Sequence, residues 1–151
     1  MVGALSGIRV IDFGRAAVGP LAATYLGMMG ADVIKVEPPE GDTVRRGHPS
    51  MKGMRTTFIG NNVTKRGIIL DLKNPVDQKI GLKLATSADV IVDNYRSHEV
   101  MVRLGLGYEA ISKINPRVIY LQSSAYGNRG PMFGMSSAEW FAQASSGYTS
   151  F

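Results

Sequence analysis

The feature of this sequence that most constrains its fold is an alternation of short apolar runs with stretches of helical pattern. Such alternation is typical of strand–helix units that stack on a parallel sheet. The run at 89–93 is apolar between two aspartates, which indicates a central strand covered on both faces. We therefore predict an α/β fold, a Rossmann-like parallel sheet flanked by helices. The predicted strands span residues 8–13, 32–37, 67–72, 89–93 and 117–121.

Helix signals separate these runs. Pro20 stands near a first helical position, where its missing N–H costs nothing, and Asn74 before Pro75 is a strong N-cap signal. The predicted helices span about 19–29, 75–85, 108–114 and 137–144, with a further helical segment near Val100. The predicted core contains Val10, Ile11, Val33, Ile34, Ile91, Val92, Val118 and Ile119.

Length and composition limit the classes of protein that remain. At 151 residues the chain has room for one domain with a proper core, so we expect a single domain over 1–151. The sequence contains no cysteine and its two histidines lie far apart, so we predict no disulfide and no metal site. No apolar run approaches the roughly 20 residues of a membrane-spanning helix, and the first residues lack the basic start of a signal peptide. We expect a cytoplasmic protein with no membrane partner.

A basic stretch lies between Arg45 and Arg66. Its cations could bind nucleotide phosphates, nucleic acid or an acidic protein face, and a solvated loop is the equally simple alternative. Phe58 is its one aromatic residue and it holds no recognisable nucleic-acid motif, so we predict no nucleic-acid partner. The cations are Arg45, Arg46, Lys52, Arg55, Lys65 and Arg66.

Ligands of open α/β sheets bind at the carboxyl ends of the strands, where loops converge. The turn at 14–20 has two glycines, but they lack the GxGxxG spacing of dinucleotide-binding folds, and Pro20 removes an amide donor. Glu37, at the end of the second strand, could still mimic a ribose-binding acid. The turn also places Arg15 and backbone amides at a helix start, which favours an anionic group nearby.

Blocks of sequence follow one another in a recognisable order: LSGIRVIDF at 5–13, GADVIKVE at 30–37, ADVIVDNY at 88–95, RLGLGY at 103–108 and INPRVIY at 114–120. In this order they resemble the class III CoA-transferases of the formyl-CoA transferase and carnitine CoA-transferase kind. The resemblance covers essentially the whole chain, and its specificity lies in the order of the blocks. It implies the amino-terminal part of the large domain of that fold.

The resemblance implies a coenzyme A site, with coenzyme A arriving as an acyl-CoA substrate. The implied site residues are Arg15, Val18, Leu70, Lys73, Asn94, Tyr95 and Arg103. The first two match positions along the pantetheine arm and the active-site entrance, the next two match the adenosine end, and the last three complete the pocket. Guanidinium and ammonium groups suit the 3′-phosphate and diphosphate of coenzyme A, and a tyrosine ring suits its adenine.

Departures from the family pattern limit this transfer of roles. Pro38 stands where one family member has a nucleotide-binding arginine, and Thr57 stands where an active-site tyrosine is expected. The stretch 94–98 carries one residue more than the usual turn, which leaves the register of 96–102 open.

The implied reaction is acyl-CoA:carboxylate CoA transfer through an aspartyl mixed anhydride. Glu139 matches an acid that borders the thioester, with helix capping as an equal alternative. Ala138 stands where related α-methylacyl-CoA racemases have a histidine base, which favours transfer over racemisation. The nucleophilic aspartate would lie beyond Phe151, so we expect a truncated enzyme or a short subunit, inactive alone. A racemase-like enzyme and a non-catalytic CoA-binding subunit stay as alternatives.

The resemblance also implies partners. An acyl-CoA and a carboxylic acid are the expected small molecules, and the full-length protein is expected to form an interlocked homodimer or a heteromer. Because further polypeptide normally covers this domain, residues 1–151 alone should expose apolar surface and self-associate.

Overall fold

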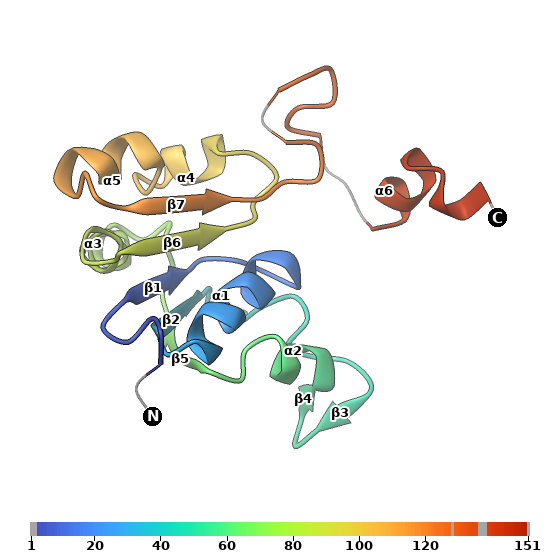
Figure 1. Ribbon diagram of the computed structural model, residues 1–151, viewed down its shortest axis with the longest axis horizontal. Coiled ribbons are helices and arrows are strands. Elements are labelled where there is room, and N and C mark those ends of the chain that lie inside the picture. Colours follow the sequence, from blue (N-terminus) through green and yellow to red (C-terminus); the bar gives the residue numbers. More distant parts are fainter. Residues whose placement is uncertain (1–2, 128, 136–138, 151) are drawn as a thin grey trace.

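Five parallel strands form the centre of the protein (Figure 1). The computed structural model describes residues 3–127, 129–135 and 139–150. The sheet has the order β5-β2-β1-β6-β7, and every pair of neighbouring strands in it is parallel. The strands are β1 (Arg9–Asp12), β2 (Asp32–Glu37), β5 (Lys65–Ile69), β6 (Val90–Asp93) and β7 (Ile119–Gln122). The predicted fold class, a parallel α/β sheet flanked by helices, is therefore confirmed.

Helices cover both faces of this sheet. Adjacent residues of β1 point to opposite faces, so Ile11 joins a core with residues of three helices while Val10 joins a second core with Ala23. The first core packs under α3 (Pro75–Thr86), α4 (Glu99–Arg103) and α5 (Tyr108–Ile114), and the second under α1 (Val18–Met28). The strand order reverses between β1 and β6, which makes their carboxyl ends the natural place for a ligand.

Local sequence signals explain several element boundaries. The side chain of Asn74 accepts a hydrogen bond from the Val76 amide at 2.8 Å, so α3 begins with the predicted N-cap and with Pro75 in its first turn. β2 and α5 have the bounds that the sequence predicted. Residue types that begin or end helices and strands flank each of these elements, which is why the sequence pattern alone located them.

Two predictions about the sheet are wrong. β5 spans Lys65–Ile69 rather than 67–72, because its pairing with β2 begins at Lys65. Ile119 is 65 % exposed rather than buried, because β7 is an edge strand that α1 does not cover. Ile34 is only partly buried, and the remaining predicted core residues are buried: Val10, Ile11, Val33, Ile91, Val92 and Val118.

The basic stretch does not form one patch. It folds into a hairpin, β3 (Ser50–Met51) with β4 (Met54–Arg55), and the short helix α2 (Thr56–Gly60). Arg45 pairs with Glu37 and Arg66 pairs with Asp32 at the opposite end of the strands, while Lys65 is buried against Asp12. Three of the six cations of this stretch are therefore paired with carboxylates of the protein itself.

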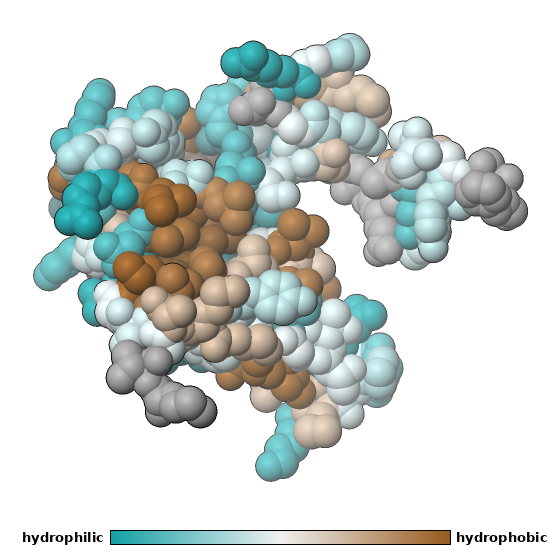
Figure 2. All heavy atoms as spheres, in the orientation of Figure 1, coloured by the Kyte–Doolittle hydropathy of each residue, from teal (hydrophilic) through white to brown (hydrophobic). Residues whose placement is uncertain are grey.

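One face of the sheet is bare beside α1. Figure 2 shows apolar residues gathered there, over β6 and β7. Ile119 and Leu121 on β7 and Tyr25 and Met28 on α1 are among the exposed large apolar side chains. The last elements, α6 (Glu139–Ser145) and the 3-10 turn Tyr148–Ser150, lie apart from the sheet (Figure 1). None of the helices in the described ranges is long and apolar enough to cross a bilayer.

Candidate functional site

A pocket of about 450 Å³ lies at the carboxyl ends of β2, β5 and β6. Its walls come from residues 36–40 at the end of β2 and just beyond it, residues 70–73 after β5, and α4 with the residue that follows it. Five of the seven coenzyme A residues that the family resemblance implies line this pocket: Arg15, Leu70, Lys73, Tyr95 and Arg103. Segments distant in sequence thus converge where the topology predicts a ligand.

Three cationic side chains and an aromatic ring line the pocket, together with the carboxylates of Glu37, Glu40 and Asp71. The Arg15 guanidinium lies 5.3 Å from the centre of the Tyr95 ring, and its Nε is buried with no hydrogen-bond partner in the described chain. Lys73 and Arg103 are exposed at the rim. Burial raises the pKa of the Tyr95 hydroxyl although Arg15 acts to lower it, so Tyr95 is neutral at neutral pH. Such a set of groups can hold phosphates around an aromatic ring.

Glu37 lines the pocket, but its carboxylate is already engaged. Arg45 donates to both oxygens, at 2.9 Å from Nε and 2.5 Å from Nη2, and the Asp42 amide donates at 3.0 Å. The Arg45 guanidinium also stacks 4.1 Å from the centre of the Phe58 ring. Burial acts to raise the pKa of Glu37, but Arg45 and the Asp42 amide outweigh it and hold this pKa below its ordinary value. Glu37 is therefore a poor candidate for a ribose-binding acid, which weakens the dinucleotide alternative.

Side chains from other parts of the protein form hydrogen bonds with the backbone groups of the turn after β1. The Gly14 amide donates to Asp12 Oδ1 at 2.7 Å, and the Gly14 carbonyl accepts from Lys35 Nζ at 2.8 Å. Asn94 accepts from the Arg15 amide at 2.7 Å and donates to the Arg15 carbonyl at 2.8 Å. These amides cannot also cradle a phosphate, so the two glycines of this turn serve packing: a Cβ on Gly14 would lie 2.7 Å from Asp12 Oδ1.

Asn94 and Val18 do not line the pocket. The Asn94 amide is occupied by the Arg15 peptide group, which makes it a clamp between β6 and the turn after β1. Val18 begins α1 with 62 % of its surface exposed. The family resemblance implies ligand contact for both residues, which stays a prediction, and the structure places both beside the turn that carries Arg15.

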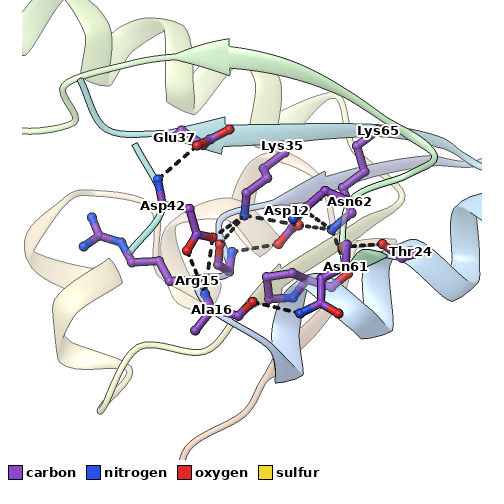
Figure 3. A network of polar contacts seen from close by, with 12 residues as sticks. Asp12, Arg15, Ala16, Thr24, Lys35, Glu37, Asp42, Asn61, Asn62 and Lys65 are labelled. Carbon is purple, nitrogen blue, oxygen red and sulfur yellow. Dashed lines mark hydrogen bonds and ion pairs between the residues drawn. The ribbon is translucent and has the colours of Figure 1, made fainter. Parts of the chain in front are cut away.

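Four buried charges lie beneath this turn (Figure 3). Lys65 Nζ donates to Asp12 Oδ2 at 2.7 Å and Lys35 Nζ lies 3.1 Å from Asp42 Oδ2, with side-chain exposures of 0–3 % in all four residues. Lys65 Nζ also donates to the Pro20 carbonyl and to Asn62. Two lysines and two aspartates balance each other, and every carboxylate oxygen of the cluster accepts at least one hydrogen bond or ion pair.

Comparison with known proteins decides the family. The sequence profile of CoA-transferase family III matches residues 5–151. The chain belongs to this family. Over 129 residues it is 41 % identical to the succinyl-CoA–L-malate CoA-transferase beta subunit of Chloroflexus aurantiacus, covering 84 % of this chain and 32 % of that protein. Over 146 residues it is 40 % identical to the acetyl-CoA:oxalate CoA-transferase of Acetobacter aceti, covering 96 % of this chain and 37 % of that protein.

A solved family structure supports the same assignment. The crystal structure of a CAIB/BAIF family protein from Brucella suis superposes with a TM-score of 0.91 at 31 % sequence identity, covering 97 % of this chain and 40 % of that one. The chain thus spans about a third of the length of the curated CoA-transferases it matches. The described part of the protein holds no cluster of histidine, aspartate and glutamate suited to a metal ion.

Sequence reasoning missed a second cavity, of about 650 Å³, on the other side of α4. It is lined in part by Asp93 and Gln122, which are register partners at the ends of β6 and β7. Asp93 Oδ2 and Gln122 Nε2 are buried without hydrogen-bond partners in the described chain. Burial raises the pKa of Asp93 to about 6, although the Tyr95 amide, the Tyr120 hydroxyl and His98 act to lower it. The position of Asp93 at the end of a predicted strand was the available signal for this cavity in the sequence.

The implied acid of the family's thioester site cannot be placed against these cavities. Glu139 is the first residue of α6, but its side chain lies outside the described part of the structure, as does the whole of Ala138.

Proposed function

We propose that this chain is the coenzyme A-binding part of an acyl-CoA:carboxylate CoA-transferase, which moves coenzyme A from an acyl-CoA donor to a carboxylic acid. The observation that carries the proposal is the pocket at the ends of β2, β5 and β6, where Arg15 lies over the Tyr95 ring and Lys73 and Arg103 line the same pocket. Family membership supplies the reaction class, since its curated relatives are CoA-transferases for different acids.

The pocket would bind the nucleotide end of coenzyme A through side chains. The backbone amides of Gly14 and Arg15 are engaged within the protein, so phosphate recognition falls to the guanidinium and ammonium groups. Bidentate guanidinium–phosphate pairs are among the strongest hydrogen-bonded contacts in proteins. Tyr95 and Leu70 would pack against the adenosine, and the exposed Val18 would lie along the path of the acyl arm.

The proposed reaction has three acyl transfers. An aspartate carboxylate attacks the thioester carbonyl, which breaks the carbon–sulfur bond, forms a mixed anhydride and releases the coenzyme A thiolate. The acceptor carboxylate then attacks the donor acyl carbon of this anhydride and frees the aspartate. The thiolate attacks the acceptor carbonyl of the new anhydride, which gives the product thioester and releases the donor carboxylic acid. We place the nucleophilic aspartate beyond Phe151, and we assign Glu139 a supporting role beside the thioester.

A second candidate is a subunit that binds coenzyme A within a heteromeric transferase. The observation that favours it is the Chloroflexus aurantiacus relative, which is itself a beta subunit. The two candidates share the pocket and differ in whether one polypeptide completes the active site. Acyl exchange by the purified full-length protein, with and without a co-purifying chain, separates them.

Calorimetric titration of the full-length protein with coenzyme A tests the site. Lys73→Ala and Arg103→Ala should each weaken binding about five- to tenfold at low salt, because each removes a phosphate-binding cation. Lys83→Ala is the matched control, since Lys83 is an exposed lysine in the last turn of α3 and does not line the pocket. Dephospho-coenzyme A, which lacks the 3′-phosphate, should lose sensitivity to whichever cation binds that group. Unchanged affinity in both pocket variants would refute the site.

A further inference from the structure

The turn at 14–16 adopts a conformation that its own sequence does not favour. Ala16 has φ of 60°, in the left-handed region that non-glycine residues seldom adopt. Its amide donates to Asp42 at 3.1 Å and 3.2 Å from the two carboxylate oxygens, and its carbonyl accepts from Asn61 Nδ2 at 3.2 Å. The surroundings, rather than the local sequence, therefore impose this conformation.

Asp42 is the part of those surroundings that can hold the Ala16 amide. Its side chain is fully buried, and Oδ1 also accepts from the Val44 amide at 3.0 Å while Oδ2 lies 3.1 Å from Lys35 Nζ. Lys35 Nζ in turn donates to the Gly14 carbonyl. Asp42 and Lys35 together thus hold the turn at two points, one on each side of Arg15 (Figure 3).

The position of the Arg15 side chain depends on this arrangement. Asn94 fixes the Arg15 peptide group from the β6 side, while Asp42 fixes the next amide from the β2 side. With the backbone held from both sides, the guanidinium is directed over the Tyr95 ring at the pocket wall. Loss of the Asp42 contact would release Ala16 from the left-handed region and turn the Arg15 side chain away from the ring.

We propose that Asp42 is a positioning residue of the nucleotide pocket and acts through the turn that carries Arg15. The proposal rests on the proposed function in that the pocket is taken as the coenzyme A site. Asp42 itself does not line the pocket, and its side chain contacts the turn that carries Arg15, so the proposed effect on ligand binding passes through Arg15. An effect of this kind is non-additive with the removal of Arg15, whereas a general loss of stability is not.

A double-mutant cycle on the full-length protein measures this coupling. Asp42→Ala should raise the Kd for coenzyme A about tenfold. In an Arg15→Ala background, the same change should alter the Kd by less than about twofold, because the group it positions is gone. Asp42→Asn keeps one acceptor for the Ala16 amide, so it should recover part of the affinity. Equal losses in both backgrounds, or no loss in either, would overturn the proposal. If Asp42→Ala does not fold, the cycle is run with Asp42→Asn.

Limited trypsin digestion tests the turn without coenzyme A. The bond after Arg15 should be cleaved faster in Asp42→Ala than in the unmodified protein, because the turn is no longer held closed. Asp32→Asn is the control, since it also removes a carboxylate charge but Asp32 pairs with Arg9 and Arg66 at the opposite end of the strands. Cleavage at Arg15 unaffected by Asp42→Ala would refute the positioning role. An unmodified protein that does not bind coenzyme A would refute the proposed function, and the digestion would still judge the role of Asp42.

Discussion

Buried carboxylates have opposite electrostatic surroundings in two regions of the protein. Beneath the turn after β1, Asp12 and Asp42 are fully buried and each is matched by a buried lysine. At the ends of β6 and β7, Asp93 is as deeply buried, yet one of its oxygens has no partner in the described chain. The difference shows that burial alone does not define the state of a carboxylate, because its partners decide whether the charge is stabilised or penalised.

These two environments give stability opposite dependences on pH. The folded state lowers the pKa of Asp42, where the Val44 amide and Lys35 outweigh burial, so the stability it contributes is lost as pH falls through that lowered pKa. The folded state raises the pKa of Asp93 from 3.8 to about 6, so the folded protein binds more protons than the unfolded chain in that window. Stability from Asp93 is therefore present below pH 3.8 and is lost as pH rises through about 6.

The largest expected effect on stability comes from removing a buried lysine that is paired with a buried carboxylate beneath the turn after β1. Lys35→Met leaves Asp42 buried without its cation and should lower the free energy of unfolding by about 3–5 kcal/mol. Arg66→Met, which removes the cation of the exposed pair with Asp32, should lower it by less than about 1 kcal/mol. Urea unfolding of both variants measures the contrast. Similar losses in the two variants would contradict the distinction between buried and exposed pairs.

Replacing the buried carboxylate at the end of β6, which lacks a matching cation, should stabilise the protein. Asp93→Asn removes a carboxylate that is penalised when ionised, so the variant should gain about 2 kcal/mol at about pH 8. The gain should fade as pH falls from about 6 towards 3.8, where Asp93 of the unmodified protein is protonated in the folded state. Thermal unfolding across this pH range is the measurement. A gain that did not vary with pH would mean that Asp93 carries no unfavourable charge.

The two cavities should differ in their response to coenzyme A. Lys73→Ala removes a cation of the pocket at β2, β5 and β6, and the expected loss of coenzyme A binding is about 1 kcal/mol, or about fivefold. Arg129→Ala removes a cation of the second cavity and should leave the affinity within about twofold of the starting value. Side-by-side titrations at one salt concentration make the comparison. The reverse order of effects would move the coenzyme A site to the second cavity.

The smallest effect on stability is expected at the bare sheet face. Ile119→Lys replaces an exposed side chain, so the free energy of unfolding should change by less than about 0.5 kcal/mol. The same change should reduce self-association of a polypeptide of residues 1–151, because it places a charge in an exposed apolar region. Sedimentation of the two polypeptides at equal concentration gives the result. If the unmodified polypeptide is monomeric, the expectation that this exposed apolar face causes self-association is wrong.

Much of the fold could be predicted from the sequence because its signals are local. Asn74 before Pro75 located α3, and the apolar run at 89–93 located a central strand. The bounds of β5 depend on its pairing with β2, and the exposure of Ile119 depends on how much of the sheet α1 covers. Both are tertiary properties, so local sequence signals could not predict them.

The candidate site could likewise be predicted only in part. The order of the family's sequence blocks was enough to predict that Arg15, Lys73 and Tyr95 share one pocket. The buried roles of Lys65 and Asn94 had no signal in the sequence, because a lysine in a basic stretch is normally predicted to be an exposed cation. Only the geometry shows that these side chains bind the protein's own backbone and charges.

Ala16 affects the unfolded chain as well as the folded one. A glycine would adopt the left-handed conformation freely, but it would also leave the unfolded chain with more backbone conformations to lose. Alanine costs about 1 kcal/mol in the folded turn, and the bonds from Asp42 and Asn61 offset this strain. The turn is therefore already ordered before any ligand binds, so the proposed binding of a phosphate by Arg15 should cost little further conformational entropy.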